Sequence, residues 1–71
     1  MELRKIRKEK GYTLQQVSQA LGVTKQCISN WESGIRPIKI EMLKKLAQVF
    51  NMPLAVFVVA LYGNEEKAAA N

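Results

Sequence analysis

The sequence predicts an all-α protein, folded as a compact bundle of four to five helices. Apolar residues recur along most of the chain at the i, i+3, i+4 spacing of amphipathic helices. Residues that favour helix ends, mainly threonine before an apolar run and glycine after it, separate these runs. Residues 14–33 hold two such runs with only a glycine, a valine and a threonine between them. That arrangement predicts two short helices joined by a tight turn.

The first two helices are indicated by their apolar stripes and their starts. We expect the first over about residues 2–10, where Leu3 and Ile6 share a face. The second should start after Thr13, a good N-cap with Gln16 as its capping-box partner. Its buried stripe has four residues at i, i+3, i+4 and i+7: Leu14, Val17, Ser18 and Leu21.

The third helix should be capped by Thr24 and should end near Ser33, between the stop signals Gly22 and Gly34. Its periodicity divides the helix, together with Val23 in the preceding turn, into two faces. The core face holds Val23, Cys27, Ile28 and Trp31. The outer face holds Lys25, Gln26, Ser29, Asn30 and Ser33.

The last two helices follow a connection around Pro37, which disfavours helix at the residue before it. The fourth is expected over about residues 39–50, with Asn51 as a left-handed cap. Pro53 is well placed to begin a fifth helix over 54–62, although its valines also permit a strand.

The chain has 71 residues, which predicts one domain over 1–63 and a flexible polar tail over 64–71. It carries 11 Lys and Arg against 6 Asp and Glu, a net charge of +5. This charge suits a polyanionic partner and equally suits a soluble basic surface. With one cysteine and no histidine, we expect neither an intrachain disulfide nor a metal site. The charged N-terminus and short apolar runs predict no signal peptide or membrane span, and hence a reducing cytoplasmic setting.

A pattern of residues over positions 3 to about 58 resembles one known family. The matching positions are Leu3-x-x-Ile6-Arg7, Gly11-Tyr12-Thr13, Val17-Ser18, Leu21-Gly22-Val23-Thr24, Ile28-Ser29-Asn30-Trp31-Glu32-Ser33-Gly34, Pro37, Leu43, Leu46-Ala47 and Phe50-Asn51-Met52. In this register the sequence resembles the lambdoid phage repressor and Cro proteins, the xenobiotic-response-element type of helix-turn-helix. The resemblance implies a lambda repressor-like bundle whose third helix contacts DNA bases. Leu14 and Ser18 depart from the pattern, since the family usually has a phosphate-binding Gln and an Ala there.

The outer face of the third helix is the candidate for base contacts: Lys25, Gln26, Ser29 and Asn30. Gln and Asn bond adenine through N6 and N7, Lys donates to guanine, and each good bidentate pair contributes about 1–3 kcal/mol of discrimination. The alternative is a solvated polar face. Trp31 is assigned to the core, because base stacking on aromatic residues is typical of single-strand binding.

Six residues are candidates for phosphate contacts: Arg7, Gln15, Gln16, Thr24, Arg36 and Lys39. The glutamines lie at a helix N-terminus, which attracts anions, and Arg36 and Lys39 flank another. Thr24 is also explained as a cap, and Arg36 and Lys39 as solvated cations. The resemblance further implies that Arg7 pairs with Glu32 and lies close to the DNA backbone. An exposed pair would contribute only about 0–1 kcal/mol.

The apolar segment 54–62 is the candidate dimer interface, because a helix without a polar face needs cover on its second side. With Phe57 packed inward, the residues left for a partner are Val56, Val59, Ala60 and Tyr62. A dimer would contact half-sites about 34 Å apart. The alternative is a longer core helix in a monomer.

The expected function is a sequence-specific transcriptional regulator of double-stranded DNA, a repressor-type homodimer on a near-palindromic operator. The alternative is a protein-interaction module, such as the antitoxin of a toxin–antitoxin pair, that uses the apolar C-terminal segment. The lack of histidine, metal-ligand clusters and glycine-rich phosphate loops argues against an enzyme, and no cofactor is expected.

Overall fold

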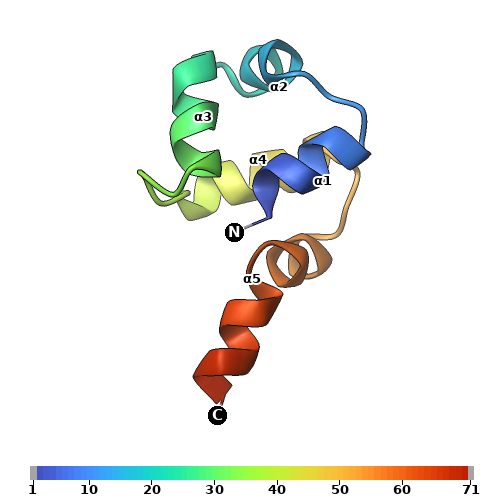
Figure 1. Ribbon diagram of the computed structural model, residues 1–71. Helices are drawn as coiled ribbons and strands as arrows, with labels where there is room; N and C mark the ends of the chain where they lie inside the picture. Colours follow the sequence, from blue (N-terminus) through green and yellow to red (C-terminus); the bar gives the residue numbers. More distant parts are fainter. Residues whose placement is uncertain (1, 71) are drawn as a thin grey trace.

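The computed structural model describes the backbone of residues 2–70 and the side chains of residues 2–63. Over that range it has helices and no strand. The helices are α1 (Leu3–Glu9), α2 (Leu14–Leu21), α3 (Lys25–Glu32), α4 (Ile40–Val49) and α5 (Leu54–Ala70), arranged as in Figure 1. The predicted all-α class is confirmed, and the first four helices lie within one or two residues of their expected bounds.

The two predicted threonine caps are present. The Thr13 hydroxyl accepts a hydrogen bond from the Gln16 amide at 3.1 Å, and the Gln16 side chain accepts one from the Thr13 amide at 2.8 Å. These reciprocal bonds form a capping box at the start of α2. The Thr24 hydroxyl accepts from the Cys27 amide at 3.1 Å and caps α3. Each bond satisfies an amide that the first helical turn leaves without a partner.

The turn between α2 and α3 depends on a left-handed residue. Gly22 has φ +73°, and its amide and that of Val23 both donate to the Ser18 carbonyl, at 2.9 and 3.0 Å. Asn51 caps α4 in the same conformation, with φ +56°, as the sequence predicted. The Gly22 turn brings α2 and α3 into contact.

Gly22→Ala should destabilise the fold by about 1–2 kcal/mol, the strain of a left-handed alanine. Strain is the expected cause because a Cβ atom added at Gly22 meets nothing within 4 Å. Gly63→Ala is the matched control, and it should stabilise by about 0.5–1 kcal/mol, because Gly63 lies inside α5 without a positive φ. Urea unfolding of both variants checks the prediction. Equal effects of the same sign would contradict it.

The core lies where the helices converge. α2 packs against α3 and α4, α4 against α5, and α1 contacts both α3 and α5. Val17, Ile28 and Leu46 are fully buried at these contacts. The Phe50 ring lies between those of Tyr12 and Phe57, with centroids 5.6 and 5.8 Å away. The predicted stripe of α2 is buried at Val17, Ser18 and Leu21, whereas Leu14 is half-buried. The core therefore holds α3 by its buried side, which carries Ile28 and Trp31.

Residues 54–62 are helical, so the helix alternative was the correct one. α5 continues beyond the expected end at Tyr62 to Ala70, in keeping with the high helix propensity of its alanines, glutamates and lysine. The side chains of 64–71 lie outside the described residues, so the flexible tail stays a prediction.

Among the described residues, no single helix is both long and apolar enough to cross a membrane. By length and composition alone, one bent pair passes that criterion: Ile40–Val49 with Leu54–Gly63, at an angle of 105°.

Candidate nucleic-acid interface

The four predicted base-contacting side chains of α3 share its outer face. Lys25 and Gln26 in the first turn are exposed, and Ser29 and Asn30 one turn later are half-buried. On the opposite face, Ile28 is 0% exposed and Trp31 4% exposed. The structure thus brings these four residues together outside the core, on a helix held by its buried side. Trp31 belongs to the core, as the sequence predicted.

Two of these side chains bond to each other. The Gln26 Nε2 atom donates to the Asn30 Oδ1 atom at 2.9 Å. The two amides were predicted to make separate base contacts, and this bond between them was not predicted. The i, i+4 spacing is the signal that could have revealed it, because residues four apart are neighbours on a helix surface.

The C-terminal end of α3 is tied to the loop that follows. The Asn30 carbonyl accepts hydrogen bonds from the amides of Ile35, at 2.9 Å, and Arg36, at 3.3 Å. The Ser33 hydroxyl donates to the Ser29 carbonyl at 3.0 Å. These bonds fix the backbone that carries Arg36 relative to the outer face of α3.

The predicted pair between α1 and α3 is present. The Arg7 Nε atom lies 2.6 Å from the Glu32 Oε2 atom. The side chains are 8% and 9% exposed, so the pair is buried and the small contribution of an exposed pair does not apply to it. Arg7 also donates through Nη1 to the Tyr12 carbonyl at 2.8 Å, a partner that the sequence analysis missed. The guanidinium is held on three sides and has little surface for a phosphate.

The other predicted phosphate contacts are exposed: Gln15, Gln16, Thr24, Arg36 and Lys39. Gln15 and Gln16 lie in the first turn of α2, and Lys39 is the N-cap of α4. The Gln16 and Thr24 side chains are also engaged in capping. Leu14 is half-buried and packs against the core, which explains what a leucine does at this position. Two helix N-termini are thus exposed together with candidate phosphate ligands.

A hollow lies between the core side of α3 and the start of α4, and the two loop cations line it. Arg36 and Lys39 line it together with Val23, Cys27, Trp31, Pro37 and Met42. Cys27 has a free thiol and is half-buried beside Trp31, in keeping with its predicted role as a small apolar residue.

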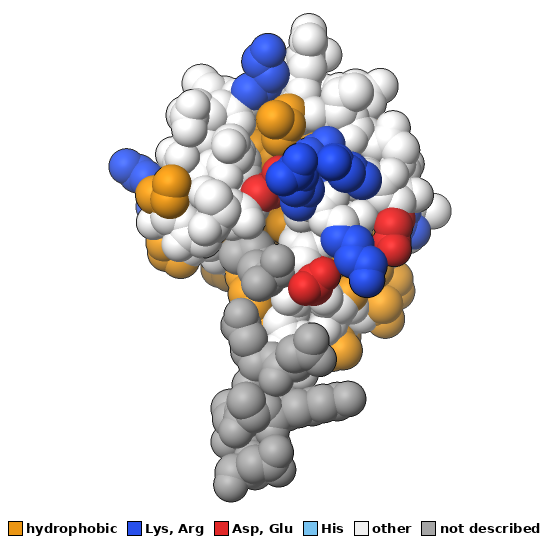
Figure 2. All heavy atoms as spheres, viewed as in Figure 1, with side chains coloured by type: hydrophobic (Ala, Val, Ile, Leu, Met, Phe, Trp, Pro, Cys, Tyr) orange, Lys and Arg blue, Asp and Glu red, His pale blue; other side chains and the backbone are white. Residues whose placement is uncertain are grey.

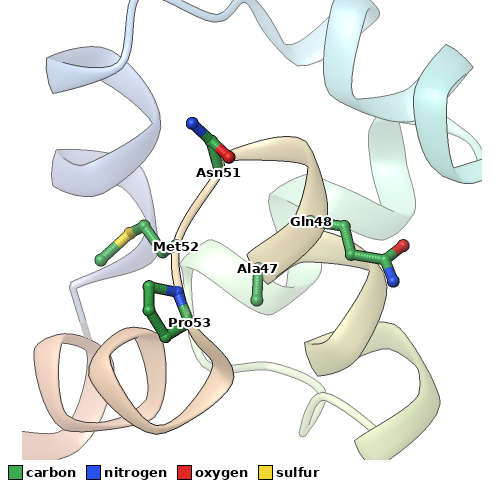
Figure 3. Close-up of a pocket in the computed structure, with 5 residues that line it drawn as sticks. All are labelled: Ala47, Gln48, Asn51, Met52 and Pro53. Carbon is green, nitrogen blue, oxygen red and sulfur yellow. The ribbon is translucent and has the colours of Figure 1, made fainter.

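A second hollow lies where α4 meets α5 (Figure 3). Ala47, Gln48, Asn51, Met52 and Pro53 line it. In the close-up, the Gln48 amide points away from the other four residues. With no charged or nucleophilic group in this lining, the hollow suggests no chemistry.

Lys and Arg side chains also gather over α1, where Figure 2 shows them beside Asp and Glu side chains. Arg4, Lys5 and Lys8 lie on α1 with Glu2 and Glu9 nearby. Because charges of both signs lie there, this surface carries a weaker field than its count of cations suggests.

The predicted dimer residues of α5 differ in exposure. Val56 is 52% and Val59 55% exposed, and Ala60 is also exposed, whereas Tyr62 is half-buried. Phe57 is fully buried, as expected. The residues described here therefore include an apolar surface on α5 that the chain itself leaves open.

Comparisons with known proteins agree with this geometry. A family model described as helix-turn-helix matches residues 3–57. A protein of Thermococcus kodakarensis named "Putative HTH-type transcriptional regulatory protein" is 30% identical over 53 residues. The match covers 75% of this chain and 17% of that protein, so the chain spans about a sixth of its relative's length. No solved structure matches. The family match covers most of the chain and includes every residue of the turn and of α3, so the chain belongs to the Cro/C1-type helix-turn-helix family.

Proposed function

We propose that this chain is a sequence-specific regulator of transcription that binds double-stranded DNA as a homodimer and represses from a near-palindromic operator, in the cytoplasm. The observation that carries the proposal is the outward polar face of α3, opposite a fully buried Ile28. The name of its relative, an HTH-type transcriptional regulatory protein, supports the same class.

In the proposed complex, α3 enters the major groove, and its N-terminal residues contact base edges. Lys25, Gln26, Ser29 and Asn30 contact the bases. Gln15 and Gln16 at the start of α2 contact the backbone on one side, and Arg36 and Lys39 contact it on the other. Thr24 adds a phosphate contact to its cap. Arg7 is 7% exposed, so only a small part of its side chain can contact a phosphate.

The proposed homodimer forms through α5. Val56, Val59, Ala60 and Tyr62 of one copy pack against the same residues of another, which closes a two-fold interface. Two copies of α3 then meet half-sites one DNA turn apart, about 34 Å. A near-palindromic operator reflects that symmetry.

The experiment is a binding selection on random duplexes, followed by titrations at several salt concentrations. We expect an enriched near-palindromic motif and an affinity that falls steeply with salt, because each phosphate contact releases counterions. Lys39→Ala should reduce the salt slope by about 1 while the preferred bases stay the same. Lys8→Ala on α1 is the control, because it removes the same charge outside the proposed contacts and should leave the slope unchanged.

A protein-interaction module, such as an antitoxin, is the second candidate. The observation that favours it is the exposure of Val56 and Val59 on α5, which suits a different protein as well as a second copy. A flat salt dependence with no enriched motif would favour this candidate over DNA binding.

A further inference from the structure

The hydrogen bond between Gln26 and Asn30 fixes an arrangement on the outer face of α3. Gln26 donates through Nε2 and Asn30 accepts through Oδ1, at 2.9 Å. Gln26 is exposed and Asn30 is half-buried, so the inner amide supports the outer one. An amide group has a donor end and an acceptor end of nearly the same shape, so its orientation decides which base edge it matches.

We propose that Asn30 is a positioning residue that holds the Gln26 amide in the orientation matching adenine, so that the operator carries an adenine at the Gln26 position. The proposal rests on the function proposed above and names the base that this surface selects.

The remaining atoms of Gln26 support this assignment. The Nε2 group has two hydrogens, and the bond to Asn30 uses one of them. The second hydrogen and the Oε1 atom are left to face a base. Together they match adenine, whose N7 accepts and whose N6 amino group donates in the major groove.

The Asn30 Oδ1 atom also couples the orientations of the two amides. If the Gln26 amide alone rotated by half a turn, its Oε1 atom would face the Asn30 Oδ1 atom and two acceptors would repel each other, so the Gln26 amide reverses only if the Asn30 amide reverses with it. A Gln26 side chain without this neighbour rotates freely, and its NH₂ group then also donates to guanine O6 or N7. Asn30 therefore sharpens the choice between adenine and guanine.

Asn30 keeps a donor of its own. Its Nδ2 group carries two hydrogens beyond the bond to Gln26, which suits an acceptor such as thymine O4 or guanine O6. Its backbone carbonyl is the group that holds the Ile35 and Arg36 amides. Changing the Asn30 side chain therefore leaves the loop after α3 in place.

The experiment compares base preferences of the full chain and its variants on the selected operator. The Gln26 position is the base pair at which Gln26→Ala relaxes the preference. There, wild type should prefer adenine by about 5- to 150-fold, the ratio that one bidentate contact supplies. Replacing that adenine by 7-deazaadenine, which lacks N7, or by purine, which lacks the N6 amino group, should weaken wild type and leave Gln26→Ala unaffected.

Two variants of Asn30 separate positioning from direct contact. Asn30→Ala should reduce the preference for adenine over guanine by about two- to tenfold, because the Gln26 side chain is no longer held in one rotamer. Asn30→Asp keeps an acceptor for Gln26 and should retain that preference, while its carboxylate lowers the affinity for all duplexes. Gln48→Ala is the control: it removes an exposed amide on α4, outside the proposed DNA contacts, and should leave the adenine preference unchanged. Thermal unfolding confirms that each variant is folded.

Several results would overturn the proposal. One is a wild-type preference for a base other than adenine at the Gln26 position. Another is an Asn30→Ala variant with the full adenine preference. If the wild-type chain enriches a motif and either result is found, only this proposal is refuted. If the wild-type chain enriches no motif, the proposed function is refuted as well.

Discussion

Glu32→Ala should cost about 3–5 kcal/mol of folding free energy, the usual effect of removing one partner of a buried ion pair. Arg7 is 7% exposed in the wild type, and the variant removes both of its bonds to Glu32, leaving the Tyr12 carbonyl as its partner among those bonds. Domains of this size have about 4–11 kcal/mol of stability in total, so the loss is a large fraction of it. Urea denaturation followed by circular dichroism measures it.

Two further variants show that the cost comes from the unpaired charge. Glu32→Gln keeps an oxygen that accepts from Arg7, so it should lie between wild type and Glu32→Ala. Where it is folded, it should bind DNA nearly as well as wild type, with a more mobile Arg7. Arg7→Met combined with Glu32→Leu removes both charges and should recover most of the loss. If Glu32→Ala cost below about 1 kcal/mol, the pair would behave as a surface salt bridge, against this prediction.

The helix starts and turns were predictable because their signals are local. Thr13 and Gln16 are three residues apart, and they form the capping box that this spacing indicates. Thr24 and Gly22 are two residues apart, and both behave as their types predict. The polar face of α3 followed from the same periodicity that placed Ile28 in the core. Interactions within one helical turn depend little on the rest of the fold.

Apart from the local Gln26–Asn30 bond, the features that the sequence did not predict depend on distant backbone. The burial of the Arg7 pair requires α1 to cross α3 closely, which no local pattern encodes. The Tyr12 carbonyl accepts from Arg7 because the chain turns after α1, bringing a backbone oxygen beside the guanidinium. The Tyr12 hydroxyl likewise donates to the Val49 carbonyl, 37 residues away. Partners of this kind are backbone atoms, which every residue carries, so residue types cannot reveal them.

Val59→Glu should convert the proposed dimer to a monomer and weaken binding to the full operator by about 10²- to 10⁴-fold. Val59 is 55% exposed, so the new carboxylate is solvated in the monomer and the fold is retained. In the dimer, two such carboxylates would lie in an apolar interface, where burial of unpaired charge is costly. Operator affinity falls because the second copy of α3 no longer binds at the effective concentration that a linked pair provides.

The measurement combines light scattering with titrations on whole operators and on isolated half-sites. Val59→Glu should bind a half-site nearly as well as a wild-type protomer does, apart from a small electrostatic loss, because α3 is unchanged. Gln48→Glu on α4 is the matched control: it introduces the same charge at an exposed residue outside α5 and should remain dimeric. A wild-type chain that scatters as a monomer and binds whole and half operators equally would refute the proposed interface. A dimer that survives Val59→Glu would place that interface on another surface.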